Sequence, residues 1–182
     1  MLKNIVKAAI AASVLAAGAA NAISVIGTAT YNGNTYKLLS EASWTDSESY
    51  AVSLGGHLVA VDDAAENTFL TNTWGSQMTL WIGLSRTAPN APTFAWSNGQ
   101  AVTFTNWAGG EPNNCCGGED YVHTYSNGQW NDLANVSGYA FPQHGVVEVS
   151  AVPEPESYAL MLAGLGLVGG LARRRARKAT EV

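Results

Sequence analysis

The sequence has few cysteines, and its middle part has few basic residues. The only two cysteines, Cys115 and Cys116, are adjacent, so they cannot join distant parts of the chain as a disulfide framework would. Residues 23–152 contain two basic side chains, Lys37 and Arg86, against eleven acidic ones, and the difference is a formal charge of −9 for this span. Phosphate binding requires a basic face, so this balance argues against nucleic acid as a partner.

A long hydrophobic run is also lacking near the N-terminus. Residues 1–22 contain two lysines, then an apolar stretch at 8–18, then the small-x-small triplet Ala20-Asn21-Ala22. This order is typical of a secretory signal peptide, so we expect the mature chain to begin at Ile23. An uncleaved membrane anchor is the alternative, although the apolar stretch is short for a bilayer span of about 20 residues.

The C-terminal end, residues 152–178, has three parts in a fixed order. A Pro-Glu-Pro motif at 153–155 is followed by a fifteen-residue apolar run at 158–172 and a basic cluster at 173–178. This arrangement resembles the PEP-CTERM sorting signal of Gram-negative bacteria. The resemblance implies transient insertion into the inner membrane through residues 158–172, cleavage by an exosortase, and release to the cell surface or extracellular space. A permanent membrane anchor is the alternative. Residues 179–182 form a short tail after the basic cluster.

Between these ends, residues 23–151 are long enough for one domain. The first half predicts two helices, with Thr45 and Glu48 as the capping pair of the first and Asp63 and Glu66 as that of the second. We expect strands, several joined by Asn-Gly turns, at 31–39, 57–61, 80–84, 94–96, 121–125, 129–130 and 146–149. Helices first and antiparallel strands afterwards indicate an α+β domain.

One polar stretch, residues 111–120, and the later triplet Trp130-Asn131-Asp132 hold most of the oxygen ligands of this domain. Carboxylates come from Glu111, Glu119 and Asp132, and amide carbonyls come from Asn113 and Asn131. Calcium takes roughly six to eight such oxygens, whereas zinc prefers His and Cys. The five side chains predict a calcium site with room for water or a ligand's hydroxyl groups. An acidic surface loop that binds nothing is the alternative.

The Glu-Pro-Asn, Glu-Asp and Trp-Asn-Asp motifs at 111–113, 119–120 and 130–132 resemble the calcium and sugar site of C-type lectin domains. The resemblance covers about residues 31–149 and implies a C-type lectin-like fold with a long calcium-binding loop. It also implies that the same five side chains bind the ion and two vicinal sugar hydroxyls, and that Pro112 follows a cis peptide bond. Mannose, glucose, N-acetylglucosamine or fucose would be preferred over galactose. Three tryptophans are expected in the core: Trp81, Trp96 and Trp107.

The chain departs from this family in its cysteines and its upstream loop. The family usually has two disulfides, but their cysteines are replaced here by Ala51, Tyr121, Asn135 and Val147. We expect Cys115 and Cys116 to form a vicinal disulfide; pairing with another chain or free thiols are alternatives. Zinc bound with His123 would have too few ligands. Residues 86–92 contain no carboxylate for an auxiliary calcium site, so we expect one calcium ion.

No histidine has neighbours typical of a catalytic base, so we do not expect an enzyme. The sequence favours calcium-dependent binding of a glycan or exopolysaccharide by an exported surface or matrix protein. Its partners during export would be the exosortase and the secretion machinery. The competing hypothesis is a calcium-independent adhesin, or a structural component of the biofilm matrix, that keeps the lectin-like fold and binds protein.

Overall fold

The fold combines a mixed β-sheet with two α-helices, as expected for the α+β class. The computed structural model describes residues 22–115, 118–136, 142–150 and 161–165. Within these ranges the elements are β1 (Val25–Tyr31), β2 (Asn34–Glu41), α1 (Trp44–Ser53), β3 (His57–Leu58), α2 (Ala64–Leu70), the π-helical turn η1 (Thr71–Gly75), β4 (Thr79–Arg86), β5 (Phe94–Trp96), β6 (Tyr121–Thr124), β7 (Trp130–Leu133) and β8 (Gln143–Val149).

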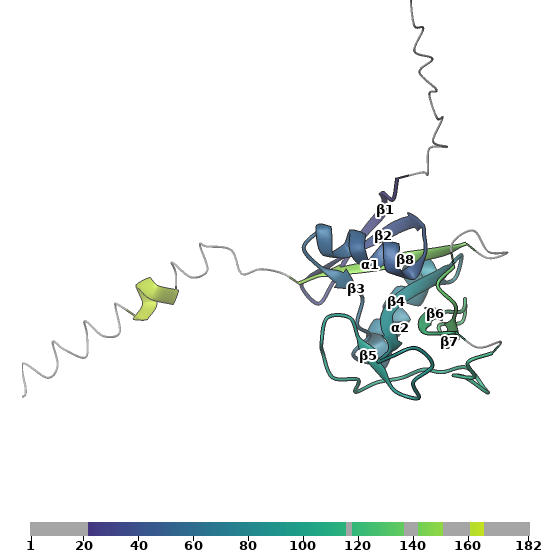
Figure 1. The fold of residues 1–182 in the computed structure, drawn as a ribbon. Coiled ribbons are helices and arrows are strands. Elements are labelled where there is room, and N and C mark those ends of the chain that lie inside the picture. The colour runs from purple at the N-terminus through teal and green to yellow at the C-terminus, as the bar shows by residue number, and fades with distance from the viewer. Residues whose placement is uncertain (1–21, 116–117, 137–141, 151–160, 166–182) are drawn as a thin grey trace, which may run out of the picture.

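The strands form one sheet in the order β1-β2-β8-β4-β6-β7, with β3 beside β8 and β5 beside β4 (Figure 1). The described strand pairs are antiparallel except for β4 and β8, which run parallel with Thr79 opposite Gln143. The sheet is therefore mixed and not purely antiparallel, because the last strand lies between β2 and β4. This central place of β8 joins the two ends of the domain.

The two hairpins predicted from Asn-Gly turns are confirmed. In the first, Tyr31 pairs with Asn34, and the turn residues Asn32 and Gly33 both have positive φ angles, of 47° and 85°. Two-residue turns of this kind match the twist of the strands they join. In the second hairpin, β6 and β7 flank the turn at 127–128 and pair from Thr124 with Trp130 to Tyr121 with Leu133.

The helix caps agree only partly with the prediction. Helix α2 begins after Asp63, whose side chain accepts a hydrogen bond from the Glu66 backbone N–H at 2.8 Å, as expected. Helix α1 is capped by Ser43 and not by Thr45, because Ser43 Oγ accepts from the backbone N–H of Asp46 at 3.2 Å. Glu48 is instead directed to β3, where its carboxylate accepts from the Leu58 backbone N–H at 2.9 Å.

The strand expected at 57–61 is shorter than predicted. Only His57 and Leu58 pair as β3, while the chain that follows is buried and extended. Its backbone still joins the sheet, since Val59 N donates to Val146 O and Val59 O accepts from Gly83 N, both at 2.8 Å. A Cβ on Gly83 would lie 2.3 Å from the Leu58 carbonyl oxygen, so this close approach of two chains requires glycine.

Aromatic side chains fill the core, as the sequence predicted. Trp81 and Trp130 are fully buried, Trp96 is 3% exposed, and Trp107 packs, partly buried, against the cluster that contains Trp96 and Trp130. Trp96, Phe104 and Trp107 each contact the ring of Trp130 edge-on, with centroids 5.7 to 5.9 Å apart. Removing a large aromatic side chain from a core costs about 3–5 kcal/mol, so this packing contributes strongly to the stability of the fold.

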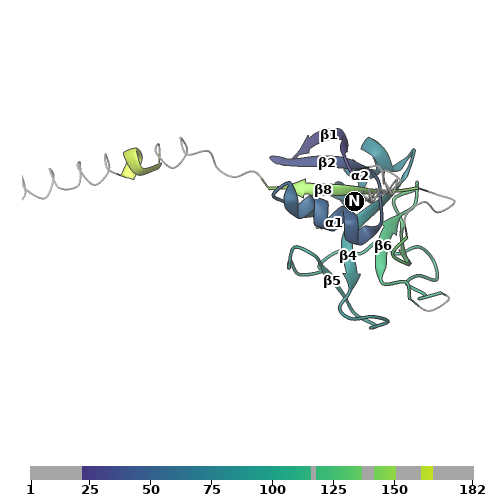
Figure 2. The same ribbon diagram turned by 45° about the horizontal axis from the view of Figure 1, so that its top comes forward.

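Trp130 also fixes the long connection between β5 and β6 to strand β7. Its backbone N–H donates to the Asn106 carbonyl at 2.8 Å, and its own carbonyl accepts from the Ala108 N–H at 2.9 Å. The connections around β5, β6 and β7 lie on the side of the domain away from β1 and β2 in both views (Figures 1 and 2). The polar loop that begins at Glu111 is thereby held beside β7.

Several predictions concern residues outside the described ranges. They include the signal peptide, almost all of the sorting segment, and Cys116 with its expected vicinal disulfide. In the C-terminal part, residues 161–165 are described and form one exposed helical turn. Among the residues that the structure describes, no helix is long and apolar enough to cross a membrane.

Candidate functional site

Residue Asp132 on β7 holds the start of the polar loop. The backbone N–H groups of Asn113 and Asn114 donate to its two carboxylate oxygens, Oδ1 and Oδ2, each at 3.0 Å. Asp132 is fully buried. The Glu111–Pro112 peptide bond, just before Asn113, is cis, as predicted. The loop is thus closed on the strand by two backbone donors, one to each carboxylate oxygen of Asp132.

A second set of hydrogen bonds brings Asn113 and Glu119 together. The Cys115 backbone N–H donates to both Asn113 Oδ1 and Glu119 Oε2, each at 2.6 Å. These two oxygens therefore lie around one nitrogen, although their residues are six positions apart in the sequence. Asn114, with a φ angle of 47°, supports the bend because its Oδ1 accepts from the backbone N–H groups of Gly118 and Glu119 at 3.1 and 3.0 Å.

The loop carboxylates affect one another's ionisation. Burial raises the pKa of Glu111 first, and the negative charge of Asp132 raises it further. Burial also raises the pKa of Glu119, and the charges of Asp132 and Glu111 add to this, while Arg86 opposes it. The three negative groups are thus close enough to repel one another, which a cation between them would relieve.

Arg86, at the end of β4, is part of this cluster, and the sequence analysis did not assign it to the site. Its Nη2 donates to Asp132 Oδ2 at 2.5 Å, and its Nε donates to the Glu119 carbonyl at 2.8 Å and lies 3.8 Å from Asp120 Oδ1. The guanidinium also lies 4.6 Å from the ring centroid of Phe94. Arg86 is one of two basic side chains in residues 23–152, and this rarity was the available signal.

Asn131, the neighbour of Asp132 on β7, lies differently from the other four predicted ligands. Its Nδ2 donates to Nε2 of His123 at 3.1 Å, and His123 Nδ1 donates to the Thr124 carbonyl at 3.2 Å. Burial lowers the pKa of His123 to about 4, so the ring is neutral and Nε2 can accept. The structure therefore brings Glu111, Asn113, Glu119 and Asp132 together, while the amide nitrogen of Asn131 faces His123.

The donor chemistry of these residues fits a hard cation. Glu111 Oε2 is buried and has no hydrogen-bond partner in the described structure, so this oxygen has lost water without gaining a donor. Carboxylate and amide oxygens suit calcium, and the described neighbours supply no thiolate and imidazole set for zinc. Within the described residues, however, no group of three or more His, Cys, Asp or Glu side chains is close enough to hold a metal ion.

Comparison with known families gives two matches along the chain. Residues 40–138 match the Lectin C-type domain, and residues 151–178 match the PEP-CTERM protein-sorting motif. The second match supports the sorting segment that was predicted at 152–178 and starts one residue earlier.

Similar proteins of known description include a lectin and a surfactant-associated protein. The chain is 35% identical over 125 residues to the alpha-N-acetylgalactosamine-specific lectin of Patiria pectinifera, which covers 61% of this chain and 73% of that protein. It is also 35% identical over 94 residues to pulmonary surfactant-associated protein D of Bos taurus, which covers 51% of this chain and 25% of that protein. The chain thus spans most of the first relative and a quarter of the second.

Solved structures show the same fold. The cow C-type carbohydrate-recognition domain of CD23, solved in the presence of a GlcNAc2Man3 oligosaccharide, aligns with a TM-score of 0.61 at 27% identity, over 69% of this chain and 95% of that one. The C-type lectin CEL-I from Cucumaria echinata aligns with a TM-score of 0.59 at 27% identity, over 66% and 93% of the two chains. Because the family match over residues 40–138 covers more than half of the chain, this protein belongs to the C-type lectin domain family.

Proposed function

We propose that this protein is an exported lectin that binds one calcium ion and, through it, sugars of the mannose, glucose and fucose type. C-type lectin domains bind carbohydrate without catalysis, which agrees with the expectation that the protein is not an enzyme. The calcium and sugar ligands in this proposal are Glu111, Asn113, Glu119, Asn131 and Asp132.

The buried Oε2 of Glu111 is the observation that carries the calcium assignment. Glu111 is half-buried and Asn113 hydrogen-bonds its carboxyl, but the Oε2 atom has no donor and the negative charge of Asp132 acts on the group, so a cation at this oxygen would be stabilising. Asn113 and Glu119 are already brought together around the Cys115 N–H. In this proposal their oxygens turn from this N–H to the ion.

Bound calcium would supply coordination sites for two vicinal hydroxyl groups of a sugar, since calcium accepts more oxygens than five side chains provide. The residues of this chain would hold the ion and hydrogen-bond the same hydroxyls, with the carboxylates accepting and the amide groups of Asn113 and Asn131 donating. Arg86 would hold the Asp132 carboxylate in place through their ion pair.

The sugar preference rests on the Glu-Pro-Asn motif at 111–113. The relative from Patiria pectinifera is described as specific for alpha-N-acetylgalactosamine, so similarity to it does not decide the preference. Retention on immobilised mannose with calcium, followed by elution with free mannose, galactose or N-acetylgalactosamine, tests this point. Elution by galactose at a lower concentration than mannose would overturn the mannose-type assignment.

The sorting motif at 151–178 suggests export and processing by an exosortase. We propose that residues 1–22 direct secretion, that residues 158–172 insert transiently in the inner membrane, and that the processed protein reaches the surface or extracellular matrix of a Gram-negative bacterium. Mass spectrometry of the secreted form tests this, because cleavage would place its C-terminus near the Pro-Glu-Pro motif at 153–155.

A calcium-independent adhesin or biofilm matrix component is the second candidate. The Arg86 contact favours it, because this guanidinium already compensates Asp132, and the described residues contain no compact group of three metal ligands. The same mannose column separates the two functions. Release by EDTA supports the calcium-bridged lectin, whereas failure to bind mannose with calcium present favours the adhesin.

A further inference from the structure

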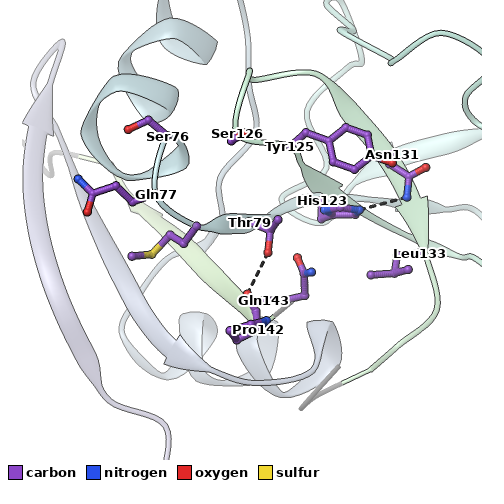
Figure 3. A pocket seen from close by; sticks show the side chains of 11 residues that line it. Ser76, Gln77, Thr79, His123, Tyr125, Ser126, Asn131, Leu133, Pro142 and Gln143 are labelled. Atoms are coloured by element: carbon purple, nitrogen blue, oxygen red, sulfur yellow. Dashed lines mark hydrogen bonds between the residues drawn. The ribbon is translucent and has the colours of Figure 1, made fainter. Parts of the chain in front are cut away.

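A cavity lies beside the candidate site, on the face of the β6–β7 hairpin that carries Asn131 (Figure 3). Its walls come from the segment 76–79 after η1, from the hairpin, and from Pro142 and Gln143 before and at the start of β8. Its volume is about 550 Å³. Cavities that hold small ligands in proteins are commonly about 300–1,000 Å³, so this one is large enough for a sugar ring.

The cavity shares one residue with the proposed calcium site and has a second residue near its charges. Asn131 is a proposed calcium ligand and also lines the cavity, and Tyr125 stands at its exposed rim. The pKa of Tyr125 is raised by partial burial and then by the charges of Glu111, Glu119 and Asp132. The cavity therefore opens within electrostatic reach of the loop carboxylates.

The lining has the mixed character that a sugar ring needs. The ring of His123 forms a buried part of the wall, and its Nε2 is engaged by Asn131 Nδ2 at 3.1 Å, as Figure 3 shows. Met78 and Leu133 add apolar surface, and Tyr125 exposes 37% of its area. Sugar rings have apolar C–H faces and polar edges, so aromatic and aliphatic walls with amide and hydroxyl groups at the rim match them.

Charge in and around the cavity selects against anionic ligands. No Lys or Arg is among the described residues that line it. Of the two basic side chains in residues 23–152, Arg86 is paired with Asp132 and Lys37 lies on β2. With one calcium ion bound, the carboxylates of Glu111, Glu119 and Asp132 still exceed its charge, and a carboxylate inside the cavity would find no Lys or Arg among its described lining residues.

We infer that this cavity binds a second, uncharged sugar residue, adjacent in the glycan to the one held at the calcium site. The inference rests on the proposed function, because Asn131 serves both subsites. It makes a neutral oligosaccharide the ligand class, and it excludes glycans with a uronate or sialate at this position.

The experiment compares three probes in calcium and in EDTA: methyl α-mannoside, α-linked mannobiose, and the same disaccharide oxidised to a uronate. Purified full chain is titrated with each. We expect mannobiose to bind with a Kd about tenfold lower than that of the methyl glycoside. The uronate should show no gain over the methyl glycoside.

Two variants test the cavity directly. Tyr125→Ala removes its exposed aromatic rim, and Ser126→Trp places a large ring on an exposed rim position. Both should bring the affinity ratio of mannobiose to methyl mannoside close to one, with calcium binding unchanged. Tyr50→Ala is the matched control. Tyr50 lies on α1 and packs against Leu39, Ala51 and Val147, which do not line the cavity. It should keep the wild-type ratio.

The outcomes separate the two claims. Calcium-dependent binding of methyl mannoside with equal affinities for all three probes would overturn the second subsite and leave the proposed function standing. Tight binding of the uronate would also overturn it. If no probe binds in a calcium-dependent way, the proposed function fails and the second subsite fails with it.

Discussion

Arg86 Nη2 lies 2.5 Å from Asp132 Oδ2, and the two side chains are 5% and 0% exposed. This ion pair joins the end of β4 to β7 beneath the candidate site. Buried pairs contribute little net stability compared with an apolar pair, but loss of one partner leaves the other charge uncompensated. The pair therefore makes the loop depend on a residue outside it.

Replacing Arg86 with Met tests this dependence. The variant leaves Asp132 buried without its cation, so the free energy of unfolding should fall by about 3–5 kcal/mol, as measured by urea denaturation in EDTA. Calcium should restore part of this loss if it binds beside Asp132. The control is Lys37→Met, which removes the other basic side chain of residues 23–152 on β2 and should change stability by less than about 1 kcal/mol. A loss for Arg86→Met no larger than the control's would show that the pair is not structural.

Glu111→Gln keeps the shape of the side chain and removes its charge. Calcium affinity and mannose affinity should both weaken by at least about tenfold, because charge-assisted bonds to the ion and to a hydroxyl are lost together. Isothermal titration calorimetry with each ligand measures both. Glu41→Gln, at the exposed end of β2, is the charge-matched control and should bind as wild type. Mannose binding that kept full strength and full calcium dependence would show that Glu111 is not a ligand.

Calcium affinity should also depend on pH in a defined direction. The pKa values of Glu111 and Glu119 are raised, so both carboxylates take up protons at a higher pH than a free glutamate with a pKa near 4.3. Carboxylates bind calcium only when ionised, so affinity should begin to fall above that pH on acidification and continue to fall to pH 4. Calcium and mannose affinities that stay constant from pH 7 to 4 would contradict calcium bridging.

A second acidic cluster, formed by the buried Glu66, the half-buried Glu148 and the exposed Asp62, predicts a different pH effect. Burial, then the charges of Glu66 and Asp62, raise the pKa of Glu148 from a reference of 4.5 to about 7. The folded state thus binds this proton more tightly than the unfolded chain does, so the ionised form destabilises the fold. This loss of folding stability is absent below pH 4.5, where Glu148 is protonated in both states, and is complete above pH 7, where it is ionised in both.

Glu148→Gln should therefore raise the melting temperature at pH 8 and have little effect at pH 4.5, since glutamine can still accept from Asn34 Nδ2 at the 2.7 Å contact. Thermal unfolding in EDTA at the two pH values measures this, with Glu41→Gln as the exposed control. An equal effect of Glu148→Gln at both pH values would show that the pKa of this carboxyl is not raised in the fold.

Local signals in the sequence predicted the parts of the fold that local chemistry determines. Asn32-Gly33 and the turn at 127–128 set two hairpins because they favour the backbone of a tight turn. Asp63 caps α2 as expected, whereas Ser43 competes successfully with Thr45 two residues away. Serine is on average the better cap of the two, and the neighbouring Trp44 packs into the core as the first residue of the helix.

Contacts between distant segments could not be predicted in the same way. The parallel pairing of β4 with β8 has no local signature, because it depends on the order of the whole sheet. Arg86 and His123 reach the site through pairing of β4, β6 and β7, so their partners Asp132 and Asn131 follow from register and not from spacing along the chain. The motif at 111–113 pointed to the loop but gave no information on these supporting side chains.

The most direct test of the account is a calorimetric titration of the purified protein with calcium at neutral pH, repeated in the presence of mannose. We predict saturable binding of about one ion, with a Kd of about 0.1–1 mM, which is typical of extracellular modules, and a tighter Kd when mannose is present. If no heat of calcium binding is measured and calcium leaves the melting temperature unchanged, the calcium-bridged lectin is contradicted and the adhesin is favoured.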